Sequence, residues 1–101
     1  MTLSYALEKY WTGIHSLAAD GSMKSRLTNA WLSVMRVNPE EDIPDQDIRR
    51  EHAHLMRELT KVQDGPGEGT FQKTLNRMTD EQAEQYGAQL VSLCYRLAEL
   101  E

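Results

Sequence analysis

The sequence predicts an all-α protein, with four long helices and one short helix in a compact bundle that forms a single domain over residues 1–101. Three observations lead to this prediction. Apolar residues recur at steps of three and four over most of the chain, which is the period of an amphipathic helix. No segment alternates apolar and polar residues with β-branched enrichment, as a half-buried strand would. The length matches one domain, and 40% hydrophobic residues are enough for a core.

The first predicted helix covers residues 2–19 and the second runs from about Met23 to Val37. The core-facing residues of the first are Leu3, Leu7, Tyr10, Ile14 and Leu17, and those of the second are Met23, Leu27, Ala30, Val34 and Val37. The second helix ends at Asn38, because the residue before Pro39 disfavours the α region. Leu32 lies on the far side of the second helix, so we expect it to be exposed.

The third predicted helix starts near Pro44 or Asp45 and ends near Val62. Its core-facing residues are Ile48, His52, Leu55, Met56, Leu59 and Val62. A glycine-rich run at 64–69 follows. We interpret it as an interhelical turn rather than a phosphate-binding loop, because its proline removes an N–H donor and Glu68 would repel a phosphate. A short helix comes next, with Phe71, Leu75 and Met78 on one side.

The last predicted helix, from Thr79 to Glu101, carries two apolar stripes. Thr79 and Gln82 have the spacing of a capping box. The first stripe consists of Ala83, Tyr86, Leu90, Leu93, Leu97 and Leu100; the second consists of Ala88, Val91, Tyr95 and Ala98. Together they span roughly 240° of the helix, against the roughly 100° that an ordinary surface helix buries. Either a further helix of this chain or another chain must therefore cover the second stripe, to which exposed Leu32 would add.

The formal net charge of −5 arises from one segment, residues 40–47, which contains five acids and no base. These acids are Glu40, Glu41, Asp42, Asp45 and Asp47. The other 11 acids equal the 11 Lys and Arg in number, which argues against a basic face and so against direct nucleic-acid binding. We interpret the segment as a solvated loop and helix N-terminus, or alternatively as a docking segment for a basic partner.

No catalytic motif, metal-ligand spacing or cofactor motif occurs in the sequence, so we expect neither an enzyme nor a cofactor. His52 and His54 point about 160° apart on a helix and cannot share a metal. His52 lies in the middle of an apolar face. It is interpreted as a core histidine bonded to a tyrosine, a tryptophan or a backbone carbonyl, and alternatively as the centre of a ligand-binding or catalytic site.

The longest apolar run is three residues, and the N-terminus lacks the features of a signal peptide, so neither a membrane span nor export is expected. The single cysteine, Cys94, cannot form an internal disulfide and lies near an apolar face. It is interpreted as a small buried hydrophobe in a reducing compartment, the cytoplasm.

Two segments carry a family resemblance: 67–84, with its Met78-Thr79-Asp80-Glu81-Gln82 helix start, and 38–42, with Leu59-Thr60 between them. In these caps and turns the chain resembles small bacterial helical proteins of unassigned function. The resemblance implies a bacterial cytosolic origin. It implies no activity, and it transfers no functional residue.

The sequence therefore predicts a small soluble protein that acts through protein–protein contact, as a homodimer or as an accessory subunit of a bacterial system. The candidate interface is Ala88, Val91, Tyr95, Ala98 and Leu32. Two alternatives stay open: a ligand-binding or enzymatic bundle centred on His52, and an acidic regulator that docks on a basic or nucleic-acid-handling protein.

Overall fold

Helices make up the regular secondary structure of the computed structural model, which describes residues 2–62 and 70–101. These residues form six α-helices and no strand, so the all-α prediction is confirmed. The helices are α1 (Leu3–Leu17), α2 (Met23–Val34), α3 (Pro39–Asp42), α4 (Gln46–Leu59), α5 (Thr70–Arg77) and α6 (Asp80–Glu99). The glycine-rich turn predicted at 64–69 lies outside the described residues.

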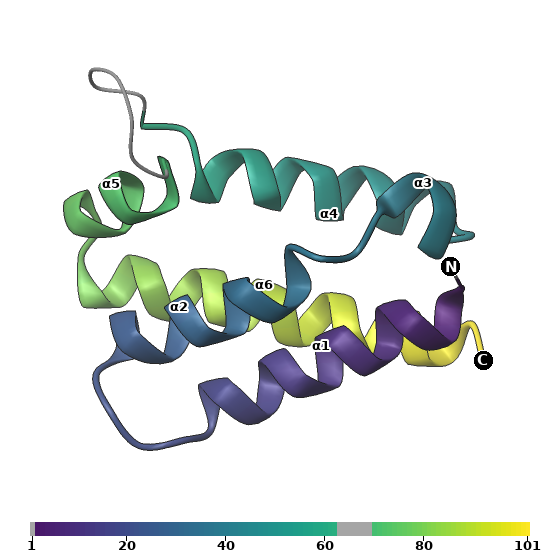
Figure 1. Cartoon of the computed structure of the whole chain (residues 1–101), viewed down its shortest axis with the longest axis horizontal. Coiled ribbons are helices and arrows are strands. Elements are labelled where there is room, and N and C mark those ends of the chain that lie inside the picture. The colour runs from purple at the N-terminus through teal and green to yellow at the C-terminus, as the bar shows by residue number, and fades with distance from the viewer. Residues whose placement is uncertain (1, 63–69) are drawn as a thin grey trace.

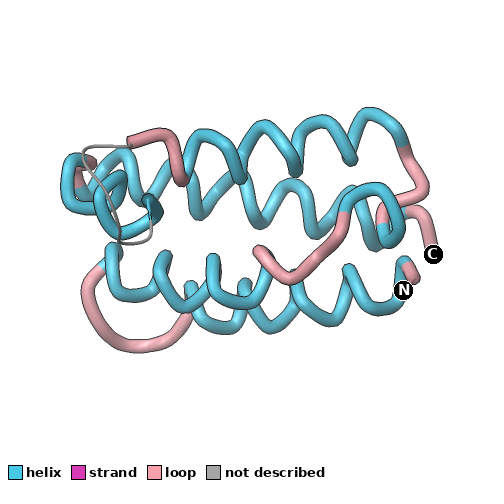
Figure 2. The backbone as a smooth tube through the Cα atoms, turned by 45° about the horizontal axis from the view of Figure 1, so that its top comes forward, coloured by secondary structure: helices cyan, strands magenta, loops and turns pink. Residues whose placement is uncertain are grey.

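α1, α2 and α6 pack against one another, and α4 packs on α6 from the other side (Figures 1 and 2). α3 leads from α2 up to α4, and α5 lies at the far end, before the chain returns through α6 (Figure 1). The two termini lie at the same end of the bundle (Figure 1). One core of buried apolar side chains joins all of these elements except the short α3, which is followed directly by buried Ile43.

The extra helix, α3, falls where the sequence predicted a loop. Its start is capped, because the side-chain oxygen of Asn38 accepts a hydrogen bond from the backbone N–H of Glu40 at 3.0 Å. Pro39 occupies the first turn, where its missing N–H costs nothing, and the following acids complement the helix dipole. These are strictly local signals, and they are sufficient for the single turn that the acidic run forms.

Capping side chains also define the starts of the long helices. Asp45 Oδ1 accepts from the N–H of Ile48 at 3.0 Å, so α4 begins at Gln46. At α6, Thr79 Oγ1 accepts from the N–H of Gln82 at 3.1 Å and Gln82 Oε1 accepts from the N–H of Thr79 at 2.9 Å. The pair forms the capping box that the sequence predicts.

α1 and α6 run antiparallel. Gly87 on α6 lies against Leu17 near the end of α1, since a Cβ on Gly87 would sit 3.4 Å from Leu17 Cδ2. Tyr10 on α1 lies near Cys94: burial is the main cause that raises the pKa of the Tyr10 hydroxyl, and the electrostatic effect of Cys94 adds to it. The middle of α1 therefore lies opposite residues 91–95 of α6.

Candidate functional site

The second stripe of the predicted last helix, called the outer stripe here, consists of Ala88, Val91, Tyr95 and Ala98. No helix of the described chain covers it fully. Ala88 is exposed, Val91 and Ala98 are half-buried, and Tyr95 is 64% exposed. Within residues 2–62 and 70–101, Tyr95 is the most exposed of the large hydrophobic residues, and it lies four residues before the end of the 20-residue helix α6.

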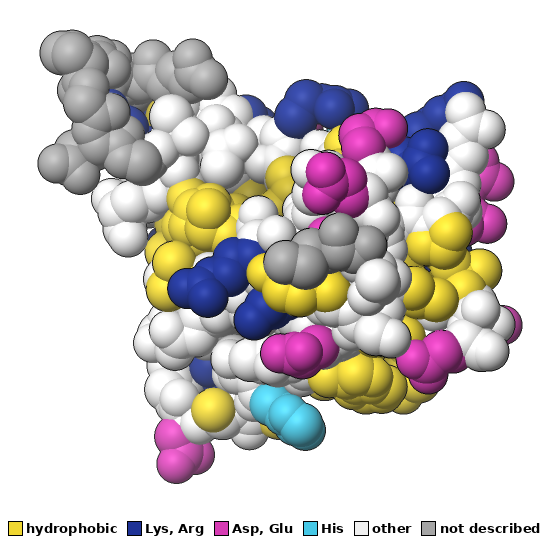
Figure 3. All heavy atoms as spheres, turned by 45° about the vertical axis from the view of Figure 1, so that its right-hand side comes forward, with side chains coloured by type: hydrophobic (Ala, Val, Ile, Leu, Met, Phe, Trp, Pro, Cys, Tyr) yellow, Lys and Arg dark blue, Asp and Glu magenta, His cyan; other side chains and the backbone are white. Residues whose placement is uncertain are grey.

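Trp11 is a second exposed aromatic residue, on α1, and its side chain is 44% exposed. On the helix it is two positions from Gly13, which packs against α2, so it points about 160° away from that contact. Because the middle of α1 lies opposite residues 91–95, Trp11 lies at the level of Val91 and Tyr95 along the bundle. Apolar side chains reach the surface along the lower edge of Figure 3, on the α1 side of the molecule.

Charged residues bound the outer stripe at both ends. Glu84 lies one turn before Ala88, and Glu99 lies one turn after Tyr95; both are exposed. Arg96, the basic residue in the last turn of α6, points to the other flank, toward α4. The stripe is therefore an aromatic and aliphatic surface with an acid at each end.

Leu32, the remaining residue of the predicted interface, is 48% exposed on α2. By helical spacing it points away from Ala30 and Val34, which are buried against the core. Leu32 therefore lies on the outer face of α2, a different helix from the one that carries the outer stripe. Sequence reasoning grouped them only because both are apolar residues on the outer faces of their helices.

Two of the five acids in segment 40–47 have structural roles. Asp42 is 1% exposed, and its Oδ2 accepts from the backbone N–H of Asn38 at 2.9 Å. Asp45 caps α4. The interpretation of the whole segment as solvated is therefore wrong for Asp42, whose carboxylate faces the interior because it closes the α3 turn back onto Asn38.

Two further acids lie beside arginines. Glu40 lies 3.9 Å from Arg49 and Asp47 lies 4.0 Å from Arg50, while Glu41 is exposed. Figure 3 shows Asp and Glu side chains interspersed with Lys and Arg on this part of the surface. The acidic run is thus locally compensated by basic residues of α4, which weakens it as a docking segment for a basic partner.

His52 is buried in the core at 1% exposure, where its Nδ1 lies 2.6 Å from the hydroxyl oxygen of Tyr10. Burial lowers the pKa of His52 to about 4, and a hydrogen bond to the backbone of Val37 opposes this shift. Burial also raises the pKa of Tyr10, so the hydroxyl keeps its proton. The neutral ring therefore accepts from Tyr10 O–H at Nδ1 and donates its N–H toward Val37. Both of its polar atoms are then occupied within the core.

Cys94 is fully buried, and burial raises the pKa of its thiol to about 11. At neutral pH it is a protonated thiol without access to solvent. No group of three His, Cys, Asp or Glu residues that could hold a metal ion occurs in the ranges 2–62 and 70–101. None of the helices described combines the length and the hydropathy needed to cross a membrane.

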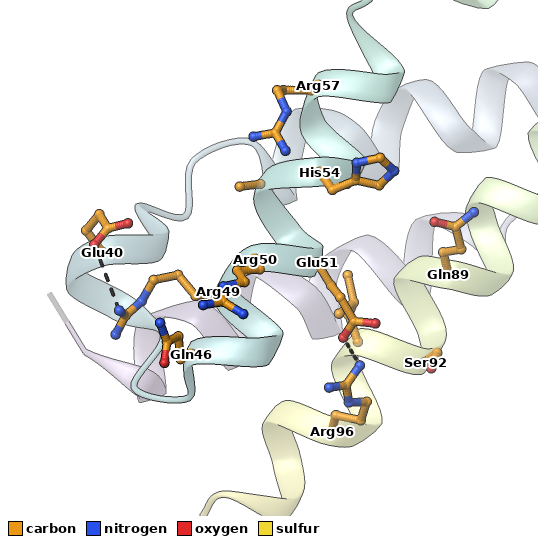
Figure 4. A pocket seen from close by; sticks show the side chains of 12 residues that line it. Glu40, Gln46, Arg49, Arg50, Glu51, His54, Arg57, Gln89, Ser92 and Arg96 are labelled. Atoms are coloured by element: carbon orange, nitrogen blue, oxygen red, sulfur yellow. Dashed lines mark hydrogen bonds and ion pairs between the residues drawn. The ribbon is translucent and has the colours of Figure 1, made fainter.

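A hollow of about 720 Å³ lies between α4 and α6, and sequence reasoning missed it. We call it the arginine groove; its basic residues are Arg49, Arg50, His54, Arg57 and Arg96. Figure 4 shows that α4 supplies most of them and that Arg96 reaches in from α6. The spacing of Arg50, His54 and Arg57 along one helix face was a signal visible in the sequence. The facing wall was not, because it comes from a helix about 40 residues further along the chain.

No family model, no curated protein and no solved structure matches this chain. The resemblance to small bacterial helical proteins therefore stays a prediction.

Proposed function

We propose that this protein is an interaction module whose outer stripe binds an apolar helix with basic ends on a partner protein. The observation that carries the proposal is the exposure of Tyr95, at 64%, in the C-terminal part of a long helix that starts with a capping box, at the level of 44%-exposed Trp11 on α1. Tyr and Trp supply a disproportionate share of binding energy in protein interfaces. Apolar surface rimmed by charge is typical of such interfaces.

The shape of the outer stripe supports a helical partner. Ala88 and Ala98 lie ten residues apart, with Val91 and Tyr95 between them, which corresponds to about 15 Å along α6. Small residues at both ends let a second helix backbone approach closely, while the aromatic ring contacts apolar residues spaced by three and four on that helix. A helix laid beside α6 would also cover Trp11.

The acids at the ends of the stripe determine the chemistry of the partner. If two copies of this chain paired through α6 in antiparallel orientation, Glu84 of one copy would face Glu99 of the other. In parallel orientation each glutamate would face its own counterpart. Both arrangements bring like charges together, in a protein whose net charge is already −5. A partner helix with Lys or Arg at each end removes this repulsion, so we favour it over the homodimer.

The test uses a designed probe: a fluorescein-labelled helical peptide with leucines at positions i, i+3, i+4 and i+7 and two lysines at each end. We expect saturable binding by fluorescence anisotropy at low salt, and weaker binding as the salt concentration rises. The matched peptide with glutamates in place of the lysines keeps the same apolar face and should bind at least tenfold more weakly.

Two variants locate the binding surface. Tyr95→Glu and Leu32→Glu each place one negative charge at an exposed apolar position, on the outer stripe and on α2 respectively. Tyr95→Glu should abolish peptide binding and Leu32→Glu should leave it unchanged. Equal effects of the two variants would contradict the assignment of the surface. In light scattering at about 100 μM, a mass twice the 11.6 kDa of the chain that is lost in Tyr95→Glu would show that the occupant is a second copy.

A further inference from the structure

We propose that the arginine groove binds a small phosphorylated organic molecule, with its phosphate group on the basic face of α4. This site is separate from the outer stripe, because the two lie on opposite flanks of α6. The hollow of about 720 Å³ falls within the range of about 300–1,000 Å³ that small-molecule sites occupy. Its lining residues all belong to helices, namely α4, α6 and Glu40 of α3.

The local charge of the groove is opposite to that of the protein. Its lining includes four arginines, at 49, 50, 57 and 96, and two glutamates, at 40 and 51, whereas the whole chain has five more acids than bases. Arg50, His54 and Arg57 are spaced at i, i+4 and i+7, so their side chains share one face of α4.

Some of the basic side chains are already occupied. Arg49 donates through Nε and Nη2 to the carbonyl of Ile43, at 3.1 and 2.9 Å, and so holds the turn after α3. Arg96 forms an ion pair with Glu51, which joins α6 to α4 (Figure 4). These two guanidinium groups build the walls of the groove and are not its ligand donors.

The side chains that remain available to donate hydrogen bonds to a ligand follow Arg49 along α4. Arg50 is 71% exposed, and its Nη1 lies 4.0 Å from the carboxylate of Asp47, which is 80% exposed, so this contact is weak. Arg57 has no carboxylate partner among the described residues. A guanidinium group presents N–H donors in a planar fork that fits two oxygens of one phosphate. We therefore assign Arg57 as the principal phosphate ligand, with Arg50 and His54 beside it.

The uncharged residues that line the groove favour a ligand with an organic part beside its phosphate group. Buried Leu93 and half-buried Ala53 form an apolar floor, and Gln89 and Ser92 on α6 present neutral hydrogen-bonding groups (Figure 4). An inorganic ion would contact only the basic side. A polymer such as a nucleic acid would need basic residues beyond the groove, and the remaining charge of the protein is acidic. A molecule with one phosphate and a compact, partly apolar body uses both walls.

The probe is phenyl phosphate, titrated at constant ionic strength into the ¹⁵N-labelled full chain and followed by amide chemical shifts. We expect saturable shifts confined to residues 50–57 and 89–96, with a millimolar dissociation constant. Three control compounds test the parts of the ligand. Inorganic phosphate lacks the phenyl ring, benzoate carries a carboxylate in place of the phosphate, and benzyl alcohol has the ring without a negative charge. Each of the three should bind several-fold more weakly than phenyl phosphate.

Arg57→Gln should weaken the binding of phenyl phosphate about tenfold, as expected for the loss of one charge-assisted bidentate contact. Arg36→Gln is the matched control, because Arg36 is exposed outside the groove, and binding should be unchanged. Shifts that do not saturate, or equal losses in both variants, would overturn the site. Benzoate or inorganic phosphate binding as tightly as phenyl phosphate would overturn the assigned ligand class. Tyr95→Glu should bind phenyl phosphate normally, so this proposal and the interaction module can fail separately.

Discussion

Tyr10 and His52, 42 residues apart in sequence, form a buried hydrogen bond of 2.6 Å between the Tyr10 hydroxyl oxygen and Nδ1 of His52. This pair joins α1 to α4 in a core that is otherwise almost entirely apolar. A polar pair in such a place contributes stability only while both partners are present and the ring is neutral. Its properties can be measured directly.

The buried ring makes stability depend on pH. The pKa of His52 is about 4 in the folded protein, against 6.5 for an ordinary histidine. The unfolded chain therefore takes up the proton below about pH 6.5, while the folded protein resists it until about pH 4. The free energy of unfolding should be highest above pH 6.5 and fall between pH 6.5 and 4, by about 3 kcal/mol from this residue.

Urea denaturation at pH 7.5, 5.5 and 4 measures this change. His54→Gln is the control, because His54 is exposed on the same helix, and it should keep the pH dependence of the parent. In His52→Gln the same interval should show a markedly smaller loss. A parent protein equally stable at pH 7.5 and 4 would show that the ring is protonated without cost and that the pair is not as tightly buried as described.

Removing one partner of the pair should be worse than removing both. Tyr10→Phe deletes the hydroxyl and leaves Nδ1 of His52 buried without a donor, at a cost of about 1–3 kcal/mol. The double variant Tyr10→Phe, His52→Leu replaces both polar groups with apolar ones. We expect it to be more stable than the sum of the two single variants predicts, in a double-mutant cycle measured by thermal unfolding. Additive effects would mean that the two side chains do not interact.

Two buried glycines should respond to alanine in opposite directions. A Cβ on Gly13 would lie 3.1 Å from Val34 Cγ1 and 3.4 Å from the Ala30 carbonyl oxygen. A β-branched side chain in a helix and a backbone oxygen have little room to move, so Gly13→Ala should destabilise the protein by about 1–2 kcal/mol. A Cβ on Gly87 would meet only the flexible ends of Leu17 and Met23, at 3.4 Å. Gly87→Ala should stabilise it by up to about 1 kcal/mol through helix propensity. Thermal unfolding distinguishes them, and a common sign would contradict the packing described here.

Two neighbouring arginines on α4, Arg49 and Arg50, allow a matched test of how strongly Arg49 stabilises α3 and the turn that follows it. Arg49 donates to the backbone carbonyls of Pro39 and Ile43, whereas Arg50 is 71% exposed. Arg49→Lys replaces the planar fork with a single ammonium group, and we expect a loss of about 1–3 kcal/mol. Arg50→Lys should change the free energy of unfolding by less than about 0.5 kcal/mol. If both variants cost the same, the turn after α3 does not depend on the arginine clamp.

The sequence allowed accurate prediction of features that depend on neighbours within one turn. The capping box of Thr79 and Gln82 and the buried face of α4 both depend on residues three or four positions apart. The sequence does not predict α3, although the cap and the proline that start this helix are local signals as well. Asn38 and Pro39 predict the end of a helix, and they are equally suited to starting one.

The sites depend on contacts between helices, and periodicity does not specify which faces meet. A balanced total of charges predicted no basic surface, yet Arg57 and Arg96 from different helices line one groove. Leu32 and Tyr95 are both exposed apolar residues, as the sequence predicts, and they project from different helices, α2 and α6.

The sequence by itself determined five of the six helices described, most of their ends and the stripe of each that is buried, because these follow from hydrogen bonds and side-chain contacts within a few residues. Only the tertiary structure decided that Tyr10 meets His52, that Gly87 packs on Leu17 and that α4 faces α6 across the arginine groove. These depend on the register between helices. That register is set by close contacts such as Gly13 with Val34, which join residues far apart in the chain and leave no periodic signal in the sequence.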